Sequence, residues 1–184
     1  MTRVLVPLAQ GCEELEAITI IDLLRRAQIE VVTAGLDDRP VKASRGTCIL
    51  PDCTLEAALK GPAFDMVVLP GGMPGADHLG NDPRLVAFLK QMAAGGKFTC
   101  AICAAPKVLA EAGLLQGKKV TAYPGFLDGG QFPGVNATGA AVERDGKIVT
   151  SRGPGTAMDF ALELIECLKD KATRDQVEKG LVRT

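Results

Sequence analysis

Residues 98–110 are Phe98-Thr99-Cys100-Ala101-Ile102-Cys103-Ala104-Ala105-Pro106-Lys107-Val108-Leu109-Ala110, a mainly apolar run followed directly by helix-forming residues. The apolar run at residues 98–102 predicts a strand buried on both faces. Pro106 suits the first turn of a helix, where its missing N–H costs no hydrogen bond. Cys103 therefore lies at a strand-to-helix junction. Because unpaired amides and the helix macrodipole stabilise an anion there, we expect the pKa of this thiol to fall from about 8.5 to ~3.5–7.5. The alternative is a small buried cysteine that only packs.

Strand-like and helix-like segments alternate along the rest of the chain, with short connections between them. Buried strands separated by helices are typical of a mostly parallel sheet covered on both faces, so the predicted fold class is α/β. The pair Asp145-Gly146 predicts the turn of a hairpin. The other predicted strands are residues 3–8, 29–34, 65–69 and 120–123, the hairpin strands are 140–144 and 147–151, and the predicted helices are 13–27, 54–59, 83–94, 156–168 and 174–182.

Composition limits the class of protein. The chain has 184 residues, 47% of them apolar, which suits one well-buried domain spanning residues 1–184. A formal net charge of −1 without basic clusters predicts neither a nucleic-acid nor a membrane partner. No segment approaches the roughly 20 apolar residues of a membrane span, and the N-terminus lacks a signal-peptide pattern. We therefore expect a cytoplasmic protein, and the six dispersed cysteines fit a reducing compartment without a metal site.

Two loops follow predicted strands, at residues 9–16 and 70–75. Since the ligand crevice of such sheets lies beyond the carboxyl ends of the strands, we expect these loops to meet near Cys103. Gly71 and Gly72 either present backbone amides as an oxyanion hole or simply form a tight turn. No Lys-Ser or Lys-Thr pair follows the glycines, and the Gly-x-Gly-x-x-Gly spacing is absent. Neither a phosphate loop nor a dinucleotide site is predicted, so we expect no cofactor.

Five motifs in order carry a resemblance to a known family. The sequence resembles the DJ-1/PfpI superfamily, and within it the DJ-1/ThiJ branch. The resemblance implies a flavodoxin-like sandwich that forms a homodimer, with a reactive cysteine at a nucleophile elbow. The motifs are Glu13-Glu14-Leu15-Glu16, Asp22-Leu23-Leu24-Arg25-Arg26-Ala27, Val67-Val68-Leu69-Pro70-Gly71-Gly72, Ala101-Ile102-Cys103-Ala104-Ala105-Pro106 and Thr150-Ser151-Arg152-Gly153-Pro154-Gly155-Thr156.

The same resemblance assigns roles to individual residues. Cys103 matches the reactive cysteine and Glu16 its partner carboxylic acid. Arg26 and Arg45 match basic residues that the family brings to the neighbouring subunit's site. The backbone amides expected around the sulfur are those of Gly71, Gly72 and Ala104, and the residues expected to line the site further out are Tyr123, Gly153 and Pro154.

The position of Glu16 allows two interpretations. It follows Glu13 by three residues, so the two share a helix face, and a solvated acid at a helix start is favoured by the dipole. If Glu16 instead points at Cys103 in an apolar crevice, desolvation and the thiolate raise its pKa. It would then be protonated, donate a hydrogen bond to sulfur and serve as acid and base.

Three differences from members of the superfamily limit which residues can take part in the mechanism. His78 is the only histidine, and the loop predicted at residues 75–80 favours a surface role for it. Cys103 is followed by Ala104, whereas the proteases and amidotransferases of the superfamily carry a histidine at or near the nucleophile, so we expect neither activity. Tyr123-Pro124 replaces a His-Pro pair of the DJ-1 branch. The mechanism would therefore rest on Glu16, backbone and water.

Two further cysteines need an interpretation. Cys100 and Cys103 form a Cys-x-x-Cys pattern, but three residues of extended strand span about 10 Å, beyond the ~7 Å limit for a disulfide, and the side chains would face opposite sides of the sheet. We therefore expect Cys100 to lie in the core. Cys12 precedes Glu16 in the first loop and is the spare cysteine expected nearest the crevice, with its role open.

Three functions remain possible from the sequence. In the first, which the resemblance implies, Cys103 and Glu16 convert 2-oxoaldehydes such as methylglyoxal without a cofactor, a glyoxalase reaction with a related repair of early glycated proteins. In the second, a redox sensor of oxidative stress, peroxide oxidises Cys103 to a sulfinate that Glu16 stabilises. The third is a holdase chaperone, for which the sequence offers no distinct feature.

A dimer is also expected from the first helix. Its apolar residues extend around more than the single stripe that covers a sheet, so part of that surface calls for a second copy of the chain. These residues are Ile18, Ile20, Ile21, Leu23 and Leu24.

Overall fold

The computed structural model describes residues 2–127 and 130–183 and is built on a seven-stranded sheet in the order β10-β11-β7-β6-β1-β2-β5. All neighbouring strands pair in parallel except β10, which is antiparallel to β11. The alternation of strands and helices thus gives the predicted α/β class. The strands are β1 (Arg3–Leu8), β2 (Glu30–Gly35), β5 (Cys53–Thr54), β6 (Met66–Leu69), β7 (Phe98–Ile102), β10 (Val142–Asp145) and β11 (Ile148–Ser151).

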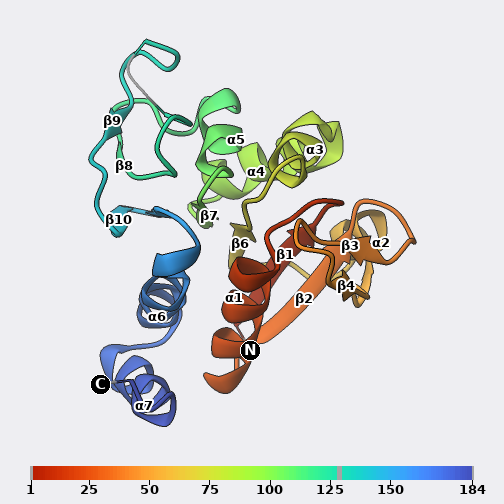
Figure 1. Cartoon of the computed structure of the whole chain (residues 1–184), viewed down its shortest axis with the longest axis vertical. Helices are drawn as coiled ribbons and strands as arrows, with labels where there is room; N and C mark the ends of the chain where they lie inside the picture. The colour runs from red at the N-terminus through yellow and green to blue at the C-terminus, as the bar shows by residue number, and fades with distance from the viewer. Residues whose placement is uncertain (1, 128–129, 184) are drawn as a thin grey trace.

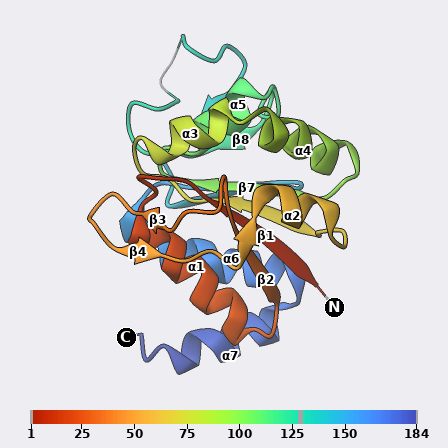
Figure 2. The same ribbon diagram turned by 90° about the vertical axis from the view of Figure 1, so that its right-hand side faces the viewer.

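Helices cover both faces of this sheet, as Figures 1 and 2 show. On one face lie α1 (Glu14–Arg26), α6 (Ala157–Leu168) and α7 (Lys171–Gly180). On the other lie α2 (Leu55–Lys60), α3 (Gly75–Asn81), α4 (Pro83–Ala94) and α5 (Pro106–Glu111). Successive residues of β1 alternate between the two cores: Val4, Val6 and Leu8 pack on the α1 side, and Leu5 on the α4 side.

Residues at the two ends of helix α1 explain where the helix begins and ends. The Glu13 carboxylate caps it by accepting from the Glu16 amide at 2.8 Å, and Arg25 and Arg26 lie in its last turn, where cations complement the macrodipole. Its inner face buries Ile20 and Leu24 completely. Leu15 and Ile18, by contrast, are 51% and 45% exposed.

Successive strands are added to the sheet on opposite sides of β1, because β2 pairs with one edge of β1 and β6 with the other. Such a switch point opens a crevice beyond the carboxyl ends of the two strands. The loops after β1 and β6 meet at this crevice, and β7 ends beside it, directly before Cys103.

Four expectations about local structure are wrong in detail. Residues 75–80 form α3 rather than a loop, so His78 is exposed on a helix. The strand expected at 120–123 is only β8 (Lys119–Val120), which pairs outside the main sheet with β9 (Asn136–Ala137). In the hairpin, Asp145 pairs with Ile148, so Gly146 and Lys147 make the turn. Helix α7 starts at Lys171 because the Asp170 carboxylate caps it.

A small antiparallel hairpin was not predicted. It consists of β3 (Val41–Lys42) and β4 (Cys48–Ile49) and lies near the N-terminal end of α1 (Figure 2). Within the described part of the chain, no helix is both long and apolar enough to cross a membrane.

Candidate functional site

Cys103 adopts a backbone conformation that few side chains tolerate. Its φ of 64° lies in the left-handed region, which for a non-glycine residue costs on the order of 1 kcal/mol or more and is held in place only by the surrounding structure. Two backbone hydrogen bonds hold it: the Cys103 amide donates to the Ser151 carbonyl at 2.9 Å, and its carbonyl accepts from the Tyr123 amide at 2.8 Å. The side chain leaves the strand at this elbow and is 8% exposed.

Glu16 is the partner of this thiol. The side chain is fully buried, and its Oε2 accepts a hydrogen bond of 2.8 Å from the Gly71 amide. The carboxyl also interacts with the Cys103 thiol. Its Oε1 has no hydrogen-bond partner among the described residues. Of the two interpretations of the sequence, the structure therefore has the buried acid and not the solvated one.

Burial raises the pKa of Glu16 to about 7, against the opposing effect of the contacts with Cys103 and Gly71. The nearby charge of Glu13 adds to the increase. At neutral pH the carboxyl therefore exists in both protonation states, which is the condition for an acid that also acts as a base.

The predicted low pKa of Cys103 is wrong for the thiol beside an ionised Glu16. Burial, and then the charge of Glu16, raise its pKa to about 12, although the amides of Gly72 and Ala104 act in the opposite direction. The sequence argument counted the helix amides and left out the desolvation. Because a proton on Glu16 removes its charge and lets it donate to sulfur, the thiolate forms when Glu16 is protonated, and the two groups titrate as a pair.

The glycines after β6 allow the close approach of three segments. A Cβ on Gly71 would lie 2.7 Å from the Cys103 Cβ and 2.8 Å from the Ile102 carbonyl oxygen. Gly72 has a φ of 87°, and a Cβ there would overlap the backbone of Cys12 and Glu13. Only glycine fits either position.

The expected set of amides around the sulfur is only partly correct. The amides of Gly72 and Ala104 face the Cys103 sulfur. The Gly71 amide instead donates to Glu16. Its role in this geometry is to orient the carboxyl, not to stabilise charge on the group that the thiol attacks.

The outer residues predicted for the site lie beside the elbow. Tyr123 is 48% exposed, and a Cβ on Gly153 would lie 3.3 Å from its ring. Pro154 begins a 3-10 turn, Pro154–Thr156, in which the hydroxyl of Thr156 hydrogen-bonds that of Ser151 at 2.7 Å. These contacts place the Tyr123 ring against the segment that follows β11.

The two predicted arginines lie away from the thiol within the chain. Arg26, at the far end of α1, pairs with Asp22 at 2.7 Å. Arg45 is in the β3–β4 hairpin, and its amide donates to both carboxylate oxygens of Glu14 at 3.0 Å. A contribution to the site of a second copy remains a prediction for both.

The other cysteines are not part of a disulfide pair with Cys103. All six are free, and Cys100 is fully buried. The expectation that Cys100 and Cys103 face opposite sides of the sheet is wrong: both join the core beneath α1 and α6, because the positive φ of Cys103 breaks the strand alternation. Cys12 is fully buried in the first loop, and burial together with Glu14 and Glu13 raises its pKa to about 12.

The sequence analysis did not predict the contribution of two residues to the site. The Ser151 carbonyl holds the Cys103 amide, and Gly75 packs so closely on the first loop that a Cβ would lie 2.6 Å from the Cys12 amide nitrogen. The Ser151 signal was present, since this residue ends a predicted strand beside a glycine-rich turn. The Gly75 contact depends on two segments far apart in sequence and has no local signal.

Comparisons with known proteins agree with this architecture. The model of the DJ-1/PfpI family matches residues 2–167. The Drosophila melanogaster protein dj-1beta is 44% identical over 179 residues, covering 97% of this chain and 95% of its own. A Caenorhabditis elegans protein named glutathione-independent glyoxalase DJR-1.2 is 34% identical over 172 residues, covering 94% of this chain and 91% of its own.

Solved structures give the same result. The structure named Toxoplasma gondii DJ-1, oxidized, superposes with a TM-score of 0.94 at 44% identity, covering 100% of both chains. The fold is therefore that of the DJ-1 proteins, a flavodoxin-like sandwich. With its buried Glu16 beside an elbow cysteine, the chain belongs to the DJ-1/PfpI family.

Proposed function

We propose that the protein is a cofactor-independent glyoxalase that converts methylglyoxal and related 2-oxoaldehydes to hydroxy acids. The observation that carries the proposal is the pairing of Cys103, at a strained elbow, with a buried Glu16 whose pKa is raised to about 7. The name of the Caenorhabditis elegans relative supports the same class of reaction. A repair of early glycated proteins would use the same two residues.

The first step forms a carbon–sulfur bond. The Cys103 thiolate, formed while Glu16 is protonated, attacks the aldehyde carbon and the carbonyl π bond opens. The oxygen receives the proton held on Glu16, which gives a hemithioacetal. The amides of Gly72 and Ala104, which already face the sulfur, lower the energy of its anionic form.

The second step moves a proton between carbons. Glu16, now a carboxylate, takes the proton from the former aldehyde carbon and returns it to the neighbouring ketone carbon. The hydroxyl proton of the hemithioacetal passes to the ketone oxygen, so that a 2-hydroxy thioester forms. Its pKa of about 7 makes it both an adequate base and an adequate acid near neutral pH. Water then hydrolyses the thioester, releasing lactate from methylglyoxal and restoring the thiol. The net change is addition of one water, so no oxidant or cofactor is needed.

The experiment is turnover of methylglyoxal to lactate by the wild type, Cys103→Ala and Glu16→Gln. Both variants should lose activity by at least about a hundredfold, because each removes a reacting group. Glu56→Gln is the matched control. Glu56 also lies in a first helical turn, but its ion pair among the described residues is with the exposed Lys60. Turnover that persists in Cys103→Ala would refute the proposal.

A second candidate is a peroxide-responsive redox protein. It is favoured by the buried Glu16 oxygen that lacks a close partner next to Cys103, and by the relative described as oxidized. Two peroxides would convert the thiol to a sulfinic acid and release two waters, and a protonated Glu16 would donate to a sulfinate oxygen. Oxidation in cells without any methylglyoxal turnover would favour this role over catalysis.

We further propose that the working form is a homodimer joined through α1. Leu15 and Ile18 lie exposed on that helix, and Leu50, just after β4, is 77% exposed. These side chains give a second copy an apolar surface to cover. Light scattering should show a dimer at micromolar concentration, and Ile18→Glu should give a monomer, whereas an unchanged mass in Ile18→Glu would place the interface elsewhere.

A further inference from the structure

The β3–β4 hairpin is too short to stand alone. Each strand has two residues, and an isolated two-stranded hairpin is at best marginally stable in water. Its position therefore depends on what it contacts. The contacts lead to the loop after β1, residues 9–13, which also forms part of the Cys103 site.

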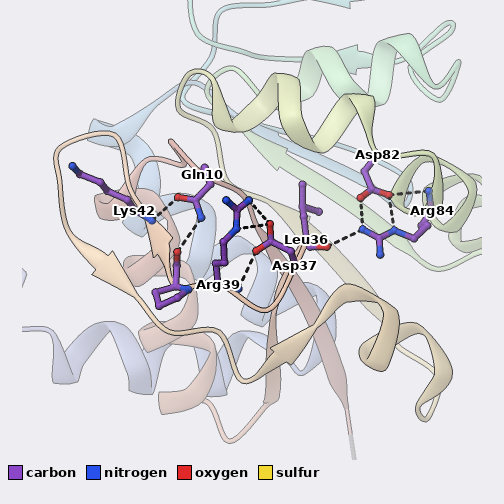
Figure 3. A network of polar contacts seen from close by, with 8 residues as sticks. Gln10, Leu36, Asp37, Arg39, Lys42, Asp82 and Arg84 are labelled. Atoms are coloured by element: carbon purple, nitrogen blue, oxygen red, sulfur yellow. Dashed lines mark hydrogen bonds and ion pairs between the residues drawn. The ribbon is translucent and has the colours of Figure 1, made fainter.

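One group of contacts joins the hairpin to Gln10 and Gly11. The Gly11 amide donates to the Lys42 carbonyl at 2.8 Å. The Gln10 side chain donates to the Pro40 carbonyl at 2.9 Å and accepts from the Lys42 amide at 2.9 Å, as Figure 3 shows for Gln10 and Lys42.

A second group joins the hairpin to Glu14, the first residue of α1. Its carboxylate accepts from the amide of Arg45 at 3.0 Å, from the amide of Thr47 at 3.3 Å and from the hydroxyl of Ser44 at 3.1 Å. Burial opposes the charge, but hydrogen bonds from its own amide and these three donors outweigh that effect and lower the pKa of Glu14 to about 2. Glu14 is therefore ionised at every physiological pH.

The loop at residues 9–13, which the hairpin holds, also contacts Gly71 and Gly72. Between its two attachments, the Cys12 carbonyl accepts from the Ser44 amide at 2.8 Å. On its other side, the Glu13 amide donates to the Gly71 carbonyl at 2.9 Å, and the loop backbone lies so close to Gly72 that no Cβ fits. Gly71 orients Glu16, and Gly72 faces the sulfur. Contacts thus run without a gap from Glu14, through the hairpin and loop, to Cys103.

We propose that Glu14 is a positioning residue: by holding the β3–β4 hairpin on the loop after β1, it keeps the Gly72 amide and the Glu16 carboxyl in place around Cys103. The role does not depend on the reaction that Cys103 performs, so it can fail or hold independently of the glyoxalase proposal. It uses a different carboxylate from the one that moves protons.

The direction in which the reactivity of Cys103 changes when Glu14 is replaced distinguishes a positioning role from an effect of the Glu14 charge alone. The charge of Glu16 acts on Cys103, and the charges of Glu14, Glu13 and Glu16 act on Cys12 in the loop after β1. If Glu14 acted only through its charge, removing that charge would favour the thiolate and make Cys103 more reactive. If Glu14 positions the Gly72 amide, removing it weakens a hydrogen bond to the thiolate and makes Cys103 less reactive.

The test is the pH dependence of Cys103 alkylation by iodoacetamide, followed by peptide mass spectrometry. Glu14→Gln should slow alkylation at pH 7 about threefold to tenfold, the size of one lost hydrogen bond, and should move the midpoint to higher pH. Ser44→Ala removes one donor and should produce a smaller change in the same direction. Exposed Cys48 supplies the internal reference, and Glu56→Gln is the charge-matched control.

Two outcomes would overturn the proposal. Faster alkylation in Glu14→Gln would show that its charge, not its contacts, acts on Cys103. Unchanged alkylation in both Glu14→Gln and Ser44→Ala would confine Glu14 to stabilising the hairpin. Circular dichroism at the assay temperature confirms that the variants are folded, and Ser44→Ala carries the test if Glu14→Gln is not.

Discussion

The Gly71 amide donates a hydrogen bond of 2.8 Å to Glu16 Oε2, and a Cβ on Gly71 would lie only 2.9 Å from that same oxygen. The residue that orients the Glu16 carboxyl must therefore also lack a side chain. Position 71 therefore has two requirements. Its amide must donate to Glu16, and no side-chain atom may occupy the space beside Glu16 Oε2.

Gly71→Ala should therefore damage both the fold and the site. Its methyl group would meet Cys103 Cβ at 2.7 Å and a backbone carbonyl oxygen at 2.8 Å, neither of which can move freely. We expect a loss of about 1–3 kcal/mol in the free energy of unfolding, measured with urea, and a loss of Cys103 reactivity. Gly180→Ala is the control, since a Cβ there meets no atom within 4 Å. Equal stability of the two variants would contradict the close packing.

The buried Glu16 predicts a stability that falls as pH rises. Its pKa is about 7 in the folded state and 4.5 as an isolated side chain, so between these values the folded state binds more protons than the unfolded state. Under this linkage the free energy of unfolding decreases from about pH 4.5 to about pH 7, by a few kcal/mol at most, and then levels off.

Urea unfolding of the wild type and Glu16→Gln at pH 5 and pH 8 measures this effect. The neutral amide removes the titration, so the variant should gain stability relative to the wild type at the higher pH. A wild type whose stability rises across this window relative to the variant would mean that Glu16 is held as a carboxylate.

Much of the fold could be predicted because short stretches of sequence determine many of its strands and helices. Strand β1, helix α4 and strand β7 have the predicted bounds, since apolar runs and Pro83 after Asp82 mark them locally. Cys103 and Glu16 were identified by motifs of a few residues. Helix α3 was missed because its sequence, Gly75 to Asn81, holds two glycines and no side-chain cap, and it is stabilised by packing rather than propensity.

The errors at the site have one physical source. The raised pKa of Cys103, the use of the Gly71 amide and the clamp at Glu14 all depend on distances between segments far apart in sequence. A motif identifies which groups are present, but desolvation and hydrogen-bond partners are set only by the packed structure. Thus the raised pKa of Glu16 was one of two alternatives that the sequence offered, whereas the raised pKa of Cys103 was not foreseen.

Peroxide should oxidise Cys103 before Cys100 or Cys53. Burial raises the pKa of all three thiols, so the surroundings of each sulfur must distinguish them. Cys103 alone has two amides and a protonatable acid directed at its sulfur. Peptide mass spectrometry should show a gain of about 32 Da, two oxygens, on Cys103 first.

Glu16 should determine how far this oxidation goes. In Glu16→Leu the sulfinate loses its donor, so oxidation should stop at the sulfenic acid or continue to the sulfonic acid. Identical products in the variant and the wild type would show that Glu16 does not contact the oxidised sulfur. Earlier oxidation of Cys53 or Cys12 would contradict the assignment of Cys103 as the reactive thiol.

Tyr123 should matter less to turnover than either member of the Cys103–Glu16 pair. Its amide donates to the Cys103 carbonyl, and its ring packs against Gly153 and edge-on to Phe126, with the ring centroids 6.2 Å apart. A phenol donates a hydrogen bond at neutral pH but is a poor proton shuttle. Tyr123→Phe keeps the ring and removes only the hydroxyl, so methylglyoxal turnover should fall less than about tenfold, as expected for one neutral hydrogen bond. Glu16→Gln and Cys103→Ser should fall much further. If Tyr123→Phe were as damaging as Cys103→Ser in a folded protein, the phenol would take part in the proton transfers, and a mechanism with Glu16 as the single acid and base would be wrong.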